Sequence, residues 1–238
     1  MAVEYNVNAV IGGLTFCYDE GNPKSGTTKE LISGATNVLI SGDEIRFGAN
    51  ALIDTMYSTG AGKDFYAPTT GTGFTISLWT KRTAATTGTW NEICLMDWNQ
   101  RCMWFGYFNN QTAQFHCSFP YYDASNAFTY WSVDPTFTNA GITHQIGTWY
   151  NICITYNNST RLLSTYMNAT FALSGTRPGT GDLVKPYNTT EPAVRIWGTQ
   201  GISTNKNHLT NNVKMYNRPL SIDEISQNFN ALKGRYGY

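Results

Sequence analysis

The carboxylates of this chain are the first residues to consider for chemistry, and two pairs of them are adjacent in sequence. These pairs are Asp43-Glu44 and Asp223-Glu224. Hydrolysis of a glycosidic bond needs two carboxyl groups about 5–10 Å apart on one wall of a cleft. The first pair is instead typical of a solvated turn, and the second of the start of a helix. We therefore expect no catalytic residues and no enzymatic activity.

Histidines and nucleophile motifs lead to the same expectation. The chain has three histidines, His116, His144 and His208, and none stands in the HxH or HExxH spacing of a metal site. We expect each to be an ordinary strand or loop residue. The chain has no GxSxG, P-loop or GxGxxG motif. The sequence therefore predicts no bound metal ion and no cofactor.

The cysteines are odd in number and show no pairing pattern. There are five of them, without a CxxC pair and without a histidine at zinc-ligand spacing. Several lie within apolar runs, and a reduced cysteine packs as a small hydrophobic side chain. We predict buried free thiols at Cys17, Cys94, Cys102, Cys117 and Cys153.

Four aromatic residues are the best candidates for a binding surface. Tyr121-Tyr122 and Tyr130-Trp131 lie in a polar stretch from residue 120 to residue 147, which we expect to be a long loop with room for an additional strand. Exposed Tyr and Trp residues there would form a protein interface or stack on sugar rings. A loop folded onto its own sheet is the third interpretation, and the sequence leaves all three open.

The charge of the chain excludes some partners. It has 16 basic and 16 acidic residues, and its charged fraction of 13% is about half the roughly 25% of an ordinary globular protein. Proteins that bind nucleic acid through phosphates normally carry an excess of Lys and Arg, so nucleic acid is not expected as a partner. Such neutrality suits an ordinary domain or a subunit of an assembly.

Targeting signals are also missing from the sequence. No run approaches the roughly 20 apolar residues that span a bilayer, so we expect no membrane partner. The first residues lack the charged and apolar regions of a secretory signal. We therefore expect the protein to fold in a cytosol.

Alternating apolar and polar residues predict many short strands. Phe74, Ile76 and Leu78 share one face of a strand, and Thr75, Ser77 and Trp79 share the other. Turn formers separate the strands, for example at residues 71–73, 175–181 and 199–201. The sequence thus predicts one all-β sandwich domain over residues 1–238. The other predicted strands are 14–18, 44–47, 101–108, 114–119, 149–156, 163–167, 194–197 and 213–216.

One helix is predicted over residues 221–233. Ser221 and Glu224 form a capping box, and Leu220 and Ile225 can form the hydrophobic staple beside it. Gly234 is placed to end the helix. Three residues at helical spacing then line one apolar face, namely Ile225, Phe229 and Leu232.

The closing segment resembles that of a known family. Laminin-G-like (LamG) jelly rolls of the concanavalin A type end in a strand with Tyr-x-Arg, followed by Leu-Ser and an acidic helix start. Residues 213–225, VKMYNRPLSIDEI, resemble this pattern. Residues 74–79 are similar to the family's central strand, and residues 149–152 with 166–168 to its Trp…Tyr-x-Asn-Gly hairpin. The resemblance implies an antiparallel jelly-roll sandwich with a short C-terminal helix.

Both ends of the chain resemble a narrower group. Residues 14–25, LTFCYDEGNPKS, and 228–237, NFNALKGRYG, are similar to the two ends of LamG-like proteins in tailed-phage virions. The resemblance implies a non-enzymatic virion protein that is assembled in the host cytoplasm. Its expected role is capsid decoration or cement, with the neck or tail as other positions. Expected partners are the major capsid protein and copies of the chain itself.

Residues 1–12 would then be an arm that docks on a neighbour, or simply a first strand. The alternative function is a lectin-like, carbohydrate-binding module for adhesion to host surface glycans.

The sequence departs from the family pattern at two places. Residues 47–49 read Phe-Gly-Ala where the family has Phe-Asp-Gly, so a carboxylate that could help to hold a calcium ion is missing, and calcium binding is unsupported. Asn168-Ala169 replaces Asn-Gly, which removes a favourable two-residue turn. The Glu-x-Asp-x-x-Glu run of enzymes with this fold is absent as well.

Overall fold

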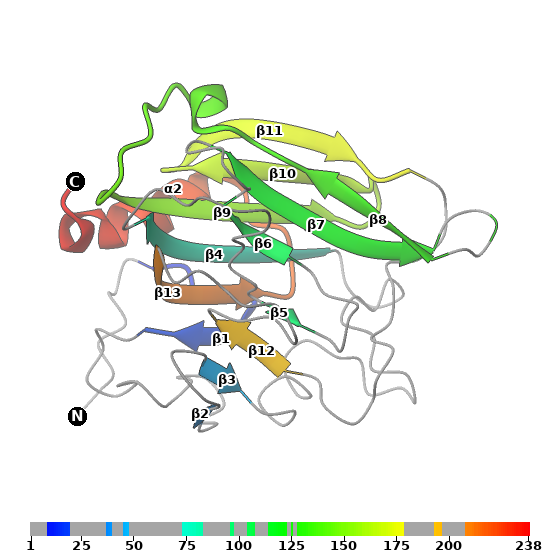
Figure 1. Ribbon diagram of the computed structural model, residues 1–238, viewed down its shortest axis with the longest axis horizontal. Helices are drawn as coiled ribbons and strands as arrows, with labels where there is room; N and C mark the ends of the chain where they lie inside the picture. The colour runs from blue at the N-terminus through cyan, green and yellow to red at the C-terminus, as the bar shows by residue number, and fades with distance from the viewer. Residues whose placement is uncertain are drawn as a thin grey trace.

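In a computed structural model of the protein, the described residues are 9–19, 37–39, 45–47, 73–82, 96–97, 104–107, 114–122, 125, 128–178, 193–196 and 208–238. Their strands stack in two layers, and a helix lies on the outside of one layer (Figure 1). Among these residues, no helix is both long and apolar enough to cross a membrane.

Six strands form the first layer, which we call the back sheet. Every neighbouring pair in it is antiparallel. In spatial order the strands are β1 (Leu14–Tyr18), β13 (His208–Tyr216), β4 (Gly73–Arg82), β9 (Trp149–Asn157), β10 (Leu162–Met167) and β11 (Thr170–Thr176).

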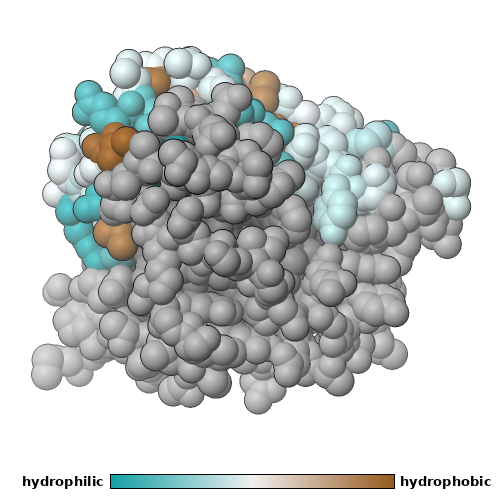
Figure 2. Space-filling view, viewed as in Figure 1, coloured by the Kyte–Doolittle hydropathy of each residue, from teal (hydrophilic) through white to brown (hydrophobic). Residues whose placement is uncertain are grey.

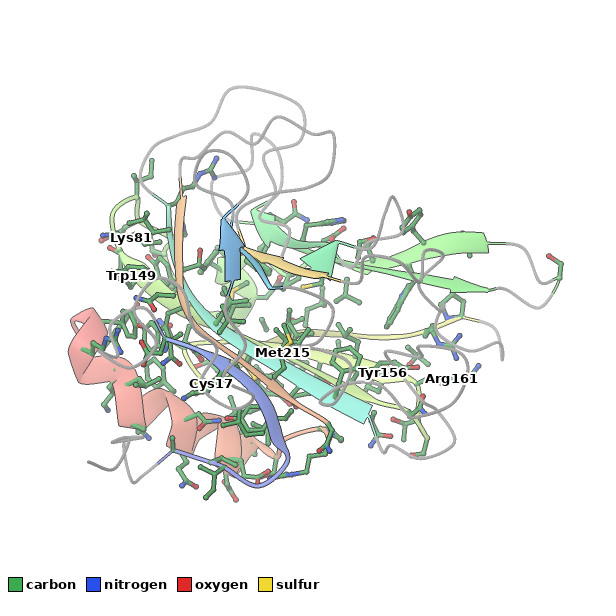
Figure 3. All side chains as sticks on the ribbon, turned by 90° about the horizontal axis from the view of Figure 1, so that it is seen from below. Cys17, Lys81, Trp149, Tyr156, Arg161 and Met215 are labelled. Carbon is green, nitrogen blue, oxygen red and sulfur yellow. The ribbon has the colours of Figure 1, made fainter. Side chains whose placement is uncertain are left out.

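The second layer, which we call the front layer, combines two smaller sheets. One has the order β2 (Asn37–Leu39), β3 (Ile45–Phe47), β12 (Ala193–Ile196) and β5 (Met96–Asp97). The other has the order β6 (Trp104–Tyr107), β7 (Phe115–Tyr122) and β8 (Phe128–Val133). β5 contacts β6, so the edges of the two sheets lie next to each other. Figures 1 and 3 place the front layer and the helix on opposite sides of the back sheet.

The core between the layers follows the alternation of the central strands. Phe74, Ile76 and Leu78 of β4 are at most 3% exposed, as predicted. The ring of Phe74 stacks on Tyr156 of the neighbouring strand with 5.5 Å between centroids. Four buried residues of β9 share this inner face, namely Tyr150, Ile152, Ile154 and Tyr156. The antiparallel sandwich with a C-terminal helix is therefore confirmed.

The opposite face of the back sheet is covered by α2 (Ile222–Leu232). Its N-terminus has the predicted capping box, because Ser221 Oγ accepts from the Glu224 amide and the Glu224 carboxylate accepts from the Ser221 amide. Trp79 of β4 stacks on Phe229 and on Tyr236, with centroid distances of 5.6 and 4.1 Å. At this end of the back sheet, Lys81 lies over the ring of Trp149 (Figure 3).

The prediction that Gly234 ends the helix is wrong. The chain tightens after Leu232 into the 3-10 helix η2 (Lys233–Tyr236), and Gly234 lies inside it. The turn is closed by Gly237, which has a φ of 90°. A left-handed residue is needed only where helical hydrogen bonding stops. Because η2 extends that bonding to Tyr236, the left-handed residue is Gly237 and not Gly234.

The predicted loop over residues 120–147 is largely ordered structure. The strand β7 continues to Tyr122, and β8 is the additional strand for which the sequence left room. A short 3-10 helix, η1 (Phe137–Ala140), follows with its own capping box at Thr136. The prediction that the four aromatic candidates lie in a loop is therefore wrong, since each of them lies in β7 or β8.

Two local turn predictions also differ from the structure. Gly175, predicted as part of a turn, lies in β11. The hairpin from β10 to β11 forms without glycine, because Asn168 and Ala169 both adopt left-handed backbone, with φ of 51° and 62°. The Asn168 side chain supports the hairpin by accepting from the Asn151 amide and donating to the Tyr238 hydroxyl.

The N-terminal segment packs on its own chain. Val10 is buried, and its amide donates to the Asn228 side chain of α2. The Tyr216 hydroxyl donates to the Val10 carbonyl, and Arg218 donates to the Gly12 carbonyl. Residues 9–12 are thus held by this chain's own helix and strands, and residues 1–8 of the predicted arm lie outside the described residues.

Three of the five cysteines lie in the described part of the chain. Cys17, Cys117 and Cys153 are buried free thiols, as predicted. Burial raises the pKa of Cys117 and Cys153, which favours the neutral thiol. Cys94 and Cys102 lie outside the described residues.

Candidate functional site

The four aromatic candidates lie on two paired strands, and the register divides them. Tyr121 and Tyr122 end β7, while Tyr130 and Trp131 lie in the middle of β8. Because neighbouring residues of a strand belong to opposite faces, positions 122 and 130 share one face of the sheet and positions 121 and 131 share the other. The four residues therefore do not form one surface.

Trp131 belongs to the face that packs on the back sheet. A Cβ built on Gly175 of β11 would lie 2.9 Å from Val133 Cγ2 and 3.4 Å from Trp131 Cζ2. The missing side chain at Gly175 lets the front layer approach the back sheet here. Trp131 is therefore a packing residue between the layers, and it is not placed to receive a ligand.

Tyr130 lies on the outer face of the front layer and heads a short row of accessible residues. Its side chain is 42% exposed, whereas its neighbour Trp131 is only partly so. Ser132 and Asp134 follow at alternate positions, and they too are exposed or half-buried. We call these three residues, Tyr130, Ser132 and Asp134, the β8 ridge. It offers an aromatic ring, a hydroxyl and a carboxylate along one line.

Asp134 is held in place by a histidine of the neighbouring strand. His116 Nδ1 lies 2.6 Å from Asp134 Oδ1, and the imidazole N–H donates to the carboxylate. His116 is only 6% exposed, whereas the side chain of Asp134 is 31% exposed. The buried histidine thus orients a carboxylate that solvent can reach. Gln114 adds a weaker bond to the Asp134 carbonyl.

The sequence did not indicate this pair. His116 and Asp134 are 18 residues apart, and neither belongs to a recognisable motif. Only the register, in which Cys117 pairs with Val133, brings the next positions together. A prediction that β7 pairs with β8 would have brought His116 and Asp134 together. The sequence instead placed residues 128–133 in a loop.

His144 belongs to a second cluster, which holds a loop. Its ring lies 4.6 Å from Phe137 and 5.2 Å from Tyr150 between centroids. Burial, helped by the charge of Arg82, lowers the pKa of His144 to about 4, so the imidazole is neutral at pH 7. The Tyr150 hydroxyl accepts from the Gln145 amide in the same loop. His208 starts β13, and its side chain lies outside the described ones.

The described residues give no support to metal binding. In the described ranges, no three His, Cys, Asp or Glu side chains gather closely enough to hold an ion. His116 and His144 lie in separate clusters with different neighbours. Within the described residues, the β8 ridge can therefore act only through stacking, hydrogen bonding and the charge of Asp134.

Comparison with solved structures identifies similar folds at low identity. The receptor-binding domain of botulinum neurotoxin D matches with a TM-score of 0.55 and 15% identity, over 94% of this chain and 53% of that one. The domain of the mosaic serotype C/D, which holds a tetraethylene glycol molecule on its Hcn sub-domain, matches with a TM-score of 0.57 and 14% identity over 92% and 50%. The chain spans about half the length of these toxin structures.

A sialidase also resembles the chain. Trypanosoma rangeli sialidase, in complex with 2,3-difluorosialic acid, matches with a TM-score of 0.51 and 15% identity over 85% of this chain and 28% of the enzyme. At such identities, the likeness shows the fold alone. A comparison with curated proteins finds no match.

A family match covers more than half of the 238 residues. It extends over residues 57–226, from before β4 into α2, and includes every strand of the β8 ridge's sheet. The resemblance of the closing strand and helix to LamG-like domains is thereby confirmed at the level of the family. The chain belongs to the concanavalin A-like lectin/glucanases superfamily, by the description of the laminin-G family whose pattern it matches.

Proposed function

We propose that the protein is a carbohydrate-binding module that holds a glycan on the outer face of the front layer, along the β8 ridge. The observation that carries this proposal is Tyr130, an aromatic side chain 42% exposed on the same face as a carboxylate held by a buried histidine. A partly exposed aromatic ring beside oriented polar groups is a feature of binding surfaces.

The chemistry of the ridge suits a sugar. The ring of Tyr130 offers an apolar face for the C–H groups of a pyranose. Asp134 accepts hydrogen bonds from sugar hydroxyls, and bonds to an ionised acceptor are about twice as strong as neutral ones. Ser132 can donate as well as accept. Because His116 already fixes the Asp134 carboxylate, little side-chain entropy is lost when a ligand binds.

The surface around β8 is mildly polar. In Figure 2 the described surface at the position of β8 in Figure 1 is pale, the colour of residues that are neither strongly polar nor apolar. A broad apolar patch would favour a protein partner. In the described part of this view no broad brown patch lies at β8, which favours a hydrated, hydroxyl-rich ligand.

The comparisons support the proposal without testing it. The family description includes lectins, and the similar structures include receptor-binding domains and a sialidase with a bound sialic acid analogue. These ligands belong to those proteins. A shared fold does not fix the function, so the case for this chain depends on its own residues. That the chain is not an enzyme stays a prediction.

A glycan array followed by calorimetry tests the proposal. We expect weak binding of one glycan class, and we expect Tyr130→Ala to reduce the affinity about tenfold, since loss of one stacked ring costs about 1–1.5 kcal/mol. The matched control is Phe171→Ala, because Phe171 is 50% exposed but lies on the back sheet. Equal losses in both variants, or no glycan bound at all, would contradict the proposal.

The second candidate is a structural role in a tailed-phage virion. It is supported by the sequence resemblance at residues 14–25 and 228–237. In the structure Asp19 and Arg235 join these two segments, with Arg235 Nη1 at 2.8 Å from Asp19 Oδ1. The described residues of the two segments, 14–19 and 228–237, are therefore joined. A decoration protein would contact the major capsid protein and copies of itself. Mass spectrometry of purified particles tests this role, and absence of the chain from them would end it.

A further inference from the structure

A cysteine and a lysine lie directly opposite each other beneath α2. In the antiparallel pairing of β1 with β13, Cys17 is the partner of Lys214, and Lys214 in turn pairs with Ser77 of β4. Side chains at directly opposite positions lie on the same side of a sheet, with Cβ atoms about 4.5–5.5 Å apart. Ser77 alternates with Thr75 and Trp79, so the pair lies on the face of the back sheet that α2 covers.

Both side chains are withdrawn from water, which is unusual for a lysine. Lys214 is 4% exposed and Cys17 is 2% exposed. Lysine is almost never buried to this extent without a partner for its charge. The Asp19 carboxylate beside it accepts from Asn212 and from Arg235. Burial lowers the pKa of Lys214, against the opposing effects of Cys17 and Asp19, and so increases the share of neutral amine with a free lone pair.

The other described cysteines have different partners. Cys153 lies on the same face as the β1 thiol but pairs with Ser77 and Tyr166. Cys117 pairs with Val133 on the face between the layers. Of the three buried thiols in the described part of the chain, only the one on β1 therefore lies opposite an amine. The thiol on β9 is its matched control.

We propose that Cys17 and Lys214 form a reversible covalent cross-link, an S–N bond made when hydrogen peroxide oxidises the thiol. This modification site is independent of the proposed glycan binding. In the described sheet β1 is an edge strand, and β13 is its neighbour. Under oxidising conditions the link ties the edge strand to the sheet, and under reducing conditions the tie is released.

The reaction balances with peroxide as the only oxidant. Hydrogen peroxide oxidises the Cys17 thiol to a sulfenic acid and leaves one water. The lone pair of the Lys214 amine then attacks the sulfur. The S–N bond forms, the S–O bond breaks, and the hydroxyl leaves with a proton of the amine as a second water. A dithiol reverses the link, because its thiolate attacks the sulfur, the amine leaves with a proton, and the dithiol is oxidised to its disulfide.

Burial decides which nucleophile meets the sulfenic acid. Peroxide is small and neutral, so brief local opening at a sheet edge admits it. A bulky thiol such as glutathione is kept away from a side chain that is 2% exposed. A sulfenic acid otherwise condenses with a thiol or oxidises further. The amine on the opposite strand is therefore the favoured partner.

Mass spectrometry after peroxide treatment tests the proposal. The folded protein is treated with hydrogen peroxide, alkylated, digested and analysed by tandem mass spectrometry. We expect a peptide with Cys17 joined to one with Lys214, at a mass about 2 Da below their sum, because two hydrogen atoms are removed. Dithiothreitol should release both peptides. In concentrated urea the yield should fall at least about tenfold, since the two residues no longer lie opposite each other.

Two variants and the matched control assign the atoms. Cys17→Ser and Lys214→Met should both lose the link, whereas Cys153→Ser should keep it. Lys214→Met places a flexible apolar side chain in a buried position, so we expect it to fold. In the unchanged protein, peroxide should raise the Tm by about 5 °C or more until dithiothreitol is added, because a link between residues far apart in sequence restricts the unfolded chain. Lys214→Met should show no such rise.

Three results would overturn the proposal. The first is Cys17 recovered from the treated folded protein as a thiol, a sulfinic acid or a sulfonic acid. The second is Cys17 joined to another cysteine, and the third is a link that forms equally well in urea. If Cys17→Ser fails to fold, the peptide map of the unchanged protein still decides between these outcomes. None of them affects the glycan-binding proposal, which depends on the β8 ridge.

Discussion

Inward and outward residues alternate along the strands of both the back sheet and the front layer. The two outer faces differ in how far the chain itself covers their aromatic residues. On the back sheet, Trp79 is fully buried beneath α2 and the C-terminal residues. On the front layer, Tyr130 reaches solvent from the middle of a strand. An aromatic residue that the same chain covers, such as Trp79, stabilises the fold, whereas one that stays partly exposed, such as Tyr130, can contact a ligand.

The polar groups of the two faces show the same contrast. Under the helix, Thr75 Oγ1 donates to the Arg218 carbonyl and accepts from the Leu220 amide. Asn228 accepts from the Val10 amide and donates to the Tyr216 hydroxyl. These bonds are internal and buried, so they bind the chain to itself. On the front layer, the Asp134 carboxylate is fixed by His116 and still faces water.

Removal of the buried ring should have the largest effect on stability. We expect Trp79→Ala to lower the free energy of unfolding by about 3–5 kcal/mol, as large-to-small changes of buried aromatic residues do. Urea unfolding followed by circular dichroism measures the change. Tyr130→Ala is the comparison, and it should stay within about 0.5 kcal/mol. Similar losses in the two variants would show that both faces are structural.

A methyl group at the contact between the layers should have the next largest effect. In Gly175→Ala the new Cβ would lie 2.9 Å from Val133 Cγ2, so the layers must separate slightly. Overpacking of this kind costs about 1–3 kcal/mol. Chemical denaturation measures it, with Ser174→Ala on the exposed side of the same strand as the control. An unchanged stability would mean that the layers are not in close contact at Trp131.

Acid should weaken the helix side through Glu224. Hydrogen bonds from Arg218 at 2.8 and 2.5 Å lower the pKa of Glu224 from 4.5 to about 2. A carboxylate with a depressed pKa in the folded state stabilises the fold fully above its unfolded pKa, and the contribution is lost as pH falls from about 4.5 to 2. Thermal unfolding over that range should show a flatter pH dependence in Glu224→Gln.

The Glu224→Gln variant should also lose up to about 1 kcal/mol at pH 7, because the ion pair with Arg218 disappears, whereas the glutamine oxygen can still accept from the Ser221 amide. Asp223→Asn, an exposed neighbour in the same helical turn, is the control and should keep the pH dependence. A pH profile unchanged by Glu224→Gln would assign the acid sensitivity to another group.

The smallest effect is expected in the hairpin between β10 and β11. Ala169 has a φ of 62°, a conformation that costs an alanine about 1 kcal/mol relative to glycine. Ala169→Gly should therefore raise the free energy of unfolding by up to about 1 kcal/mol, less the contact that its methyl group makes with the core beneath α2. A lower Tm would show that this contact outweighs the backbone strain.

Much of the fold could be predicted from the sequence because its signals are local. The alternation at residues 74–79 decides which side of β4 is buried, and it depends only on neighbours within the strand. The capping box of Ser221 and Glu224 lies within four residues, so the start of α2 is legible without any tertiary contact. β1 has the predicted limits, and the buried state of three cysteines follows from apolar surroundings.

The candidate site was less predictable, since it depends on pairing between strands. The sequence identified Tyr130 but grouped it with Trp131, which the β8 pleat turns toward the back sheet. It also treated His116 as an isolated strand residue.

By itself, therefore, the sequence determined the strand faces and the capped helix, because these follow from residues that are close along the chain. Only the tertiary structure decided that His116 meets Asp134. Strand register and the stacking of layers are set by the whole core, and they bring distant residues together without leaving a local pattern.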